Sequence, residues 1–246
     1  MAKTDATADA AGRVGPGGAT LSGATLSEVF PEPGAEAAAA GFVRTRLQDR
    51  QGPVLWVQDR MARLETGRPT LAALDGRPLL HLCLSRAVDV MVAVEEGLRC
   101  PDLSAVIAEV RGEASAISFT ALKRIALRSE AAGVPCWLIR QAARADLSAA
   151  RNRWRIATLP SAPHPDDPRA PGDPRWRLDL FRARDGRPGA WIARHERGAE
   201  AGMGPGRGAG GNGGTGGAAH RLDLVAAVSD GALAEAAGTG GQRAAR

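Results

Sequence analysis

Cysteine is scarce in this sequence, and long apolar runs are missing. The three cysteines of the 246-residue chain are Cys83, Cys100 and Cys136, and an odd number without close spacing argues against a disulfide framework or a zinc site. Cys83 and Cys136 lie in apolar runs, where we expect small core residues. No run is long enough for a transmembrane helix, and the N-terminus lacks the features of a signal peptide. We therefore expect a cytoplasmic protein with reduced thiols.

Lysine is also scarce, since Lys3 and Lys123 are the only two and arginine supplies the rest of the positive charge. Alanine, glycine and proline are abundant, a bias typical of a GC-rich genome, so the net charge of +5 is weak support for a nucleic-acid partner. The distribution is more informative. Residues 138–197 contain 13 basic and seven acidic residues, whereas residues 1–137 contain 15 and 16.

Composition divides the chain into one domain and three low-complexity segments. Residues 1–25 and 229–246 are rich in small residues without periodicity, and we expect disordered tails. Residues 198–219 are rich in glycine and lie between two strand-like runs, which indicates a disordered insert in a hairpin. The remainder of 26–228 has the size of a single domain.

Strand-like and helix-like segments alternate along the first part of the domain. We expect strands at 26–30, 53–58, 79–84, 104–110 and 134–139, and helices at 34–50, 86–99 and 118–131. Ser118 and Gly133 suit the two ends of the last helix. Four further runs, at 153–159, 175–181, 190–195 and 220–225, resemble an antiparallel set. The predicted fold is α/β: a mainly parallel sheet flanked by helices, with C-terminal antiparallel strands.

The loop after the first strand is the natural anion site of such a sheet. A working phosphate-binding loop has the pattern G-x-x-x-x-G-K-[ST], in which backbone N–H groups surround the phosphates, the lysine reaches them, and the hydroxyl binds magnesium. The corresponding stretch here is FPEPGAEA, residues 30–37. It lacks both the lysine and the hydroxyl residue.

The element order resembles the RecA core, and several runs in order along the chain closely resemble the ImuA family of bacterial mutagenesis cassettes. These runs include SEVFPEPGAEAAAAGF, LWVQDRMARLETGRP, FTALKRIALRSEAAGVPCWLIR and PRWRLDLFRARDGRPGAWI. Laid on the RecA loop, the two glycines become Phe30 and Ala35, the lysine becomes Glu36 and the hydroxyl residue becomes Ala37. We expect these substitutions to abolish ATP binding, so we predict no bound cofactor and no ATPase activity.

Two carboxylates follow buried strands at positions that matter in RecA-type ATPases. Glu109 ends the run AVIAEV, and Asp59 follows LWVQ. Both could be remnants of an ATPase site. Solvated carboxylates at strand ends are the simpler interpretation. His164, Asp166 and Asp167 lie in a proline-rich turn without a second ligand cluster, and we predict no metal site.

Arginines alternate with apolar residues in two of the late strands. In RNRWRI, Arg151, Arg153 and Arg155 alternate with Trp154 and Ile156, and in RWRLDL the arginines are Arg175 and Arg177. A strand sends alternate side chains to opposite faces. These five arginines therefore predict a basic surface for a protein partner or for DNA. A solvated sheet face remains the alternative.

The resemblance implies a non-catalytic accessory protein of SOS-induced translesion synthesis. Its implied partners are ImuB and an error-prone DnaE-type polymerase, with RecA and non-specific DNA as further candidates, and its contacts could resemble those between RecA protomers. Two alternatives stay open: a RecA-like DNA-dependent ATPase or recombinase, and a cell-division inhibitor of the SulA type.

Overall fold

The computed structural model describes residues 24–47, 51–70, 74, 76–167, 169–184, 187–196 and 221–226. The two expected tails, apart from residues 24 and 25, and the expected glycine-rich insert lie outside these residues.

Nine strands form one sheet in the order β3-β2-β4-β5-β1-β6-β7-β8-β9. The first six strands in this order are parallel to their neighbours, and β7, β8 and β9 complete the sheet with antiparallel pairs. The strands are β1 (Leu26–Pro31), β2 (Val54–Asp59), β3 (Leu79–Leu84), β4 (Ala105–Arg111), β5 (Cys136–Gln141), β6 (Asn152–Leu159), β7 (Arg175–Arg182), β8 (Gly189–Glu196) and β9 (Arg221–Ala226). The predicted fold class is confirmed. One difference within the sheet is β6, which pairs in parallel with β1 and so joins the two parts of the sheet.

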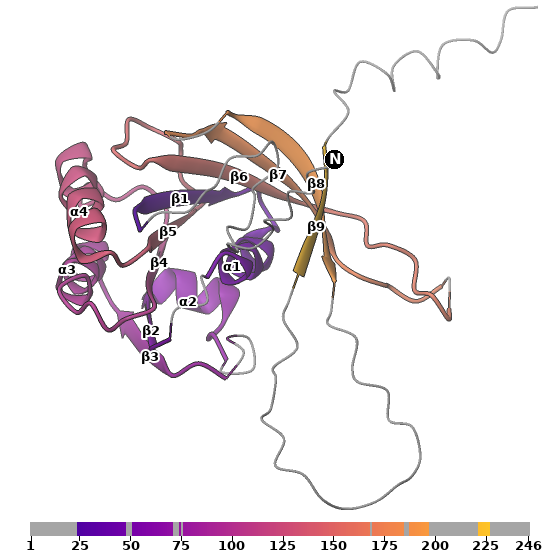
Figure 1. Ribbon diagram of the computed structural model, residues 1–246, viewed down its shortest axis with the longest axis horizontal. Coiled ribbons are helices and arrows are strands. Elements are labelled where there is room, and N and C mark those ends of the chain that lie inside the picture. Colours follow the sequence, from indigo (N-terminus) through magenta and orange to yellow (C-terminus); the bar gives the residue numbers. More distant parts are fainter. Residues whose placement is uncertain are drawn as a thin grey trace, which may run out of the picture.

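Helices cover both faces of the parallel part of the sheet (Figure 1). They are α1 (Glu36–Thr45), α2 (Arg60–Thr66), α3 (Ala87–Gly97) and α4 (Phe119–Ala132). Helix α1 packs into one hydrophobic cluster with the inner face of β6–β8. Helices α3 and α4 pack into a second cluster on the opposite face. Apolar side chains thus exclude water on both sides of β4 and β5, as continuous apolar strands require.

Local signals set the helix ends. The hydroxyl of Ser118 accepts from the N–H of Ala121 at 3.3 Å, and Gly133 has the left-handed backbone expected after a helix. Helix α2 is not among the predicted helices. Its N-cap is Asp59, which accepts from the N–H of Ala62 at 2.6 Å. Seven residues are too few to show helical periodicity clearly.

An aromatic cluster joins α1 to the late strands. The ring of Phe42 lies 4.9 Å from that of Trp154 and 6.1 Å from that of Trp137. The helix approaches β7 closely, because a Cβ on Gly41 would lie 3.0 Å from the Trp176 ring. This packing holds the second half of α1, a helix that begins at the end of the candidate phosphate loop, against β5–β7.

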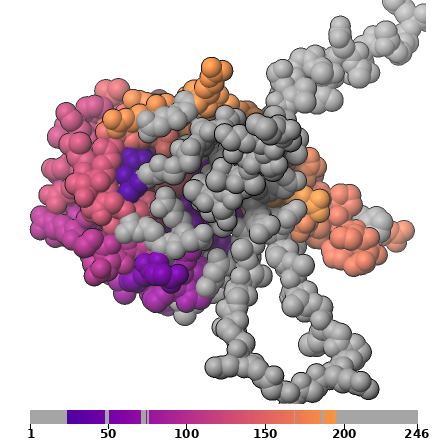
Figure 2. All heavy atoms as spheres, in the orientation of Figure 1, coloured from indigo at the N-terminus to yellow at the C-terminus, as the bar shows by residue number. Residues whose placement is uncertain are grey.

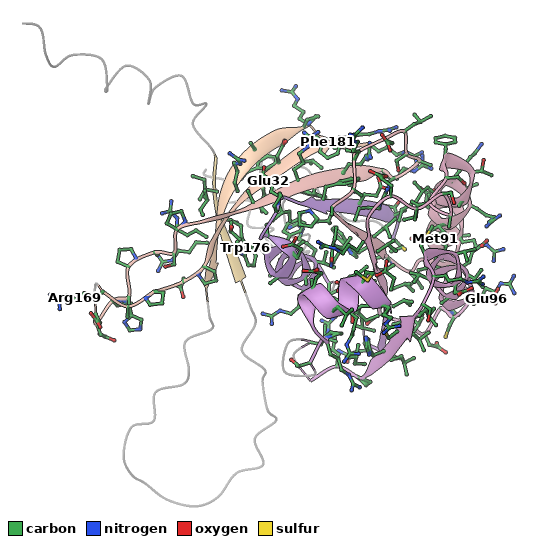
Figure 3. All side chains as sticks on the ribbon, turned by 180° about the vertical axis from the view of Figure 1, so that it is seen from behind. Glu32, Met91, Glu96, Arg169, Trp176 and Phe181 are labelled. Atoms are coloured by element: carbon green, nitrogen blue, oxygen red, sulfur yellow. The ribbon has the colours of Figure 1, made fainter. Side chains whose placement is uncertain are left out.

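The connection between β6 and β7 forms an arm that projects from the body. It is visible at one side of the space-filling view (Figure 2). Figure 3 shows Arg169 at its far end, remote from Met91 and Glu96 on α3. The arm carries His164, Asp166 and Asp167 away from the sheet.

Candidate functional site

The connection between β1 and α1 is a tight turn. The N–H of Ala35 donates to the carbonyl of Glu32 at 2.8 Å, and Gly34 has a φ of +83°. Pro33 in the second position and a positive-φ glycine in the third are the residues that a type II β-turn favours. The sequence therefore builds a compact turn where a phosphate-binding loop would be long and open.

Backbone donors are scarce in this turn. Pro31 and Pro33 have no N–H, the N–H of Glu32 donates to β6, and that of Ala35 closes the turn. Within residues 31–35, all of which the structure describes, only the N–H of Gly34 has no backbone acceptor. A phosphate cradle needs several converging N–H groups; the turn itself provides only that of Gly34, and further donors come only from the first turn of α1.

The space beside the first turn of α1 contains an ion-pair cluster. The guanidinium of Arg111, at the end of β4, lies 4.0 Å from Glu36 and 3.6 Å from Glu65 of α2. An incoming triphosphate would meet two carboxylates around one guanidinium, and like charges repel. Glu36 is also well placed for the positive end of the helix dipole.

Phe30, Ala35 and Ala37 are the other residues aligned with the phosphate-binding loop of RecA. Phe30 is buried on the α3/α4 side of the sheet, with its ring 6.0 Å from that of Phe181, so it does not enter the loop. Ala35 is fully buried and precedes α1 without a side-chain cap. Ala37 is exposed in the first helical turn and offers no oxygen to a metal ion.

Glu109 is buried in a polar network. Its carboxylate accepts from the indole of Trp56 at 2.6 Å, the hydroxyl of Thr66 at 3.0 Å and the amide of Gln141 at 2.9 Å. Burial raises the pKa of Glu109 above its usual value, and its hydrogen bonds, including those from Trp56 and Thr66, oppose that rise. These donors engage both oxygens of the carboxylate within the protein.

Asp59 has a different structural role. One carboxylate oxygen caps α2, and the other accepts from the N–H of Arg111 at 2.8 Å. Asp59 and Glu109 have exposed fractions of only 6% and 1%. The expectation of solvated carboxylates is therefore wrong for both, because α2 folds over the strand ends and excludes water there.

A pocket of about 250 Å³ lies between α1 and the segment that follows α2. Ala37, Ala40 and Gly41 form its α1 wall, while Trp56 and Glu109 contribute from the sheet. Arg44 and Arg68 also line it. Drug-sized ligands generally occupy pockets of about 300 Å³ or more. This space is thus small for a nucleotide.

The late strands alternate as predicted, with Trp154, Ile156 and Trp176 buried on the α1 side. On the other face, Arg155 lies 3.5 Å from Asp179, and Arg177 lies 2.8 Å from Glu32. Acidic neighbours therefore offset much of the expected positive charge. Figure 3 shows Glu32 and Phe181 in this region.

Arg151 and Arg153 differ from the exposed arginines. Arg151 forms an ion pair with Glu130 of α4 at 2.6 Å. The Arg153 residue is only 5% exposed, and its guanidinium lies 2.7 Å from Glu28 and 5.1 Å from the Phe181 ring. The prediction that Arg153 belongs to an exposed basic surface is wrong, because β1 supplies a buried carboxylate beside it. Arg155, Arg175 and Arg177 remain accessible.

The edge strand β3 has an unexpected exposed apolar surface. Within the described residues it pairs only with β2, and Leu80 and Leu82 are 51% and 41% exposed. Met61 and Leu64 on the neighbouring α2 are exposed too. Cys83 is exposed, so its expected core position is wrong, whereas Cys136 is buried as predicted.

Neither a metal-binding cluster nor a membrane-spanning helix occurs in the described residues. They contain no group of three or more His, Cys, Asp and Glu side chains arranged to hold a metal ion. None of their helices combines the length and apolar character needed to cross a membrane.

Sequence comparison relates the chain to known proteins. No family model matches it. It is 37% identical over 186 residues to Protein ImuA of Caulobacter vibrioides, from strains NA1000 / CB15N and ATCC 19089 / CIP 103742 / CB 15, covering 69% of this chain and 71% of the relative in each case. At this identity and coverage, the chain belongs to the ImuA family.

Proposed function

We propose that this protein is a non-catalytic accessory factor of SOS-induced, error-prone translesion synthesis, and that it acts by binding other proteins. The ImuA relatives support a role in an ImuA-type mutagenesis system. The partners we propose are an ImuB-type protein and an error-prone DnaE-type polymerase, with RecA as a further candidate. The protein works in the cytoplasm, where these partners would act.

The proposal that the protein is not an ATPase rests mainly on the β1–α1 turn. ATP hydrolysis requires backbone donors, a cation and a magnesium ligand around the triphosphate. In the turn, the N–H of Glu32 donates to β6 and that of Ala35 closes the turn, Glu36 and Ala37 supply neither cation nor hydroxyl, and Glu109 is sequestered by three donors. A RecA-like scaffold with this loop is suited to docking.

The edge of β3 supports a contact like that between RecA protomers. An unpaired strand edge can accept a strand from another chain, and side-chain pockets beside it provide specificity. Leu80 and Leu82 lie beside Leu55 and Val57 on the α3/α4 face of this edge, whereas α2, with Met61 and Leu64, lies on the other face. We propose that a partner adds an extended segment to β3 and covers Leu80 and Leu82.

A single charge at the edge tests the proposal. Leu82→Arg should weaken binding of the purified ImuB-type partner by about tenfold or more, with little change in thermal stability because the side chain is 41% exposed. Leu127→Arg is a matched control, since Leu127 is 52% exposed on α4. Equal binding by the wild type and Leu82→Arg would overturn the edge contact.

A further inference from the structure

The pocket between α1 and α2 has walls that fit one bulky apolar group. Ala37, Ala40 and Gly41 recur at helical spacing on α1 and leave space that larger side chains would fill. Opposite them lie Thr66, the last residue of α2, and residues 67–70 that follow it; α2 contacts α1 (Figure 1). The ring of Trp56, only 3% exposed, contributes an aromatic surface at the sheet.

The polar groups at the inner end of the pocket are already satisfied. Gln58 donates to Thr66 and to the carbonyl of Gly67, and its oxygen lies 2.8 Å from His81. Glu109 accepts three hydrogen bonds. A ligand that needs several new hydrogen bonds would find few free partners here. An apolar side chain has no hydrogen bonds to lose at such a surface, and its transfer out of water is favourable.

Two arginines, Arg44 and Arg68, line the pocket, whereas the neighbouring carboxylates Glu36 and Glu65 pair with Arg111. Arg60, Arg63 and Arg68 lie on α2 or directly after it, and none of them forms an ion pair with a residue in the described part of the chain. The pKa of His81 is lowered by burial first, and then by the charges of Arg68 and Arg63. The arginines near the pocket would attract acidic groups to it.

We propose that this pocket binds an acidic peptide segment of a partner protein, with one aromatic or large aliphatic side chain inserted between α1 and α2. The carboxylates of the segment would lie against Arg68 and the α2 arginines. Interfaces commonly take most of their binding energy from one such buried anchor surrounded by polar contacts. The pocket adds a second contact to the proposed docking function and rests on it for the biological partner, but it differs from the β3 edge in its residues.

Selection from a random peptide phage library against the folded protein tests the proposal. The expected winners carry several acidic residues around a single bulky apolar residue. Their affinity, measured with fluorescein-labelled synthetic peptides, should fall by about tenfold or more in Ala40→Phe, which fills the pocket, and in Arg68→Glu. Ala131→Phe on α4 and Arg169→Glu at the end of the arm are matched controls that should bind as the wild type does.

Other outcomes would overturn the proposal. Enrichment of no sequence, or of basic sequences, would contradict the charge argument. Equal peptide binding by the wild type and Ala40→Phe would place the peptide elsewhere. A peptide with its apolar residue changed to alanine that competes equally well would show an acid-binding surface without an apolar anchor. Leu82→Arg should leave peptide binding unchanged. Loss in that variant alone would assign the peptide to the β3 edge, so failure of the pocket and failure of the edge contact are distinguishable.

Discussion

The carboxylate of Glu28 and the guanidinium of Arg153 meet across β1 and β6 at 2.7 Å, and both residues are buried. Arg140 of β5 lies 3.6 Å from the same carboxylate. Glu28 therefore holds two arginines from the strands on either side of β1. The pair links the parallel part of the sheet to the antiparallel part, because β6 joins the two.

Removing Arg153 should therefore destabilise the fold far more than removing Arg155. Arg153→Ala leaves a buried carboxylate with one remaining partner, and losing one member of a buried pair costs about 3–5 kcal/mol. Arg155→Ala removes a half-exposed pair with Asp179, worth less than about 1 kcal/mol. Urea unfolding followed by tryptophan fluorescence measures both. Similar losses in the two variants would contradict the structural role of Arg153.

Glu109 should make stability fall as the pH rises above its usual pKa. In the unfolded chain this carboxyl ionises with the ordinary pKa of a glutamate, whereas burial raises its pKa in the folded chain and keeps it protonated to higher pH. The unfolded state therefore binds fewer protons between the two pKa values, and the free energy of unfolding decreases with pH there. Glu109→Gln removes this dependence.

Unfolding by urea at several pH values from about 5 to 8 checks this difference. The wild type should lose stability relative to Glu109→Gln as the pH rises. Gln141 can rotate its amide to face the new side chain, since its own oxygen has no hydrogen-bond partner in the structure. A constant difference between the two proteins over this range would show that Glu109 is not desolvated.

The accessible arginines test whether DNA is bound directly. Changing Arg155, Arg175 and Arg177 together to glutamate should weaken binding to single-stranded DNA and reduce the salt dependence by roughly one unit of slope for each lost phosphate contact. Arg86→Glu with Arg99→Glu is the control, because both lie near the ends of α3. An unchanged affinity and slope would leave these strands as a solvated sheet face.

Repairing the loop residues should not restore nucleotide binding. Glu36→Lys with Ala37→Thr supplies the missing cation and hydroxyl, but the prolines and the closed turn of residues 31–35 still provide too few N–H donors. Equilibrium dialysis with magnesium-ATP measures the result. Tight binding by this double variant would show that side chains alone, and not the backbone, had disabled the site.

Periodicity was enough to predict most of the fold. The apolar runs at β2, β4 and β5 and the alternation in β6 and β7 follow directly from burial on two faces or on one. The same reasoning predicted LLHLCL as a buried core strand, because an apolar run does not reveal whether its strand lies at the edge of the sheet. The exposure of Leu80, Leu82 and Cys83 follows from the position of β3 at the edge of the sheet. The sequence of a single strand does not reveal that position.

The candidate site was less predictable, because its contacts join distant residues. The sequence spacing alone shows that Glu36 and Ala37 stand where a phosphate-binding loop would have lysine and a hydroxyl residue. The bonds from Trp56 and Gln141 to Glu109 span 53 and 32 residues, and no local pattern indicates them. Asp59, three residues before Ala62, is a typical helix N-cap and could have indicated α2. A carboxylate after a strand is equally compatible with a catalytic role.

Titration of the purified wild-type protein with magnesium-ATP by isothermal calorimetry, with RecA as the positive control, is the most direct test of the central claim. The β1–α1 turn predicts no saturable heat and no ATP turnover, with or without single-stranded DNA. Saturable binding that Glu36→Arg or Gly34→Ala alters would contradict the account, since it would place the nucleotide at the turn that we interpret as closed.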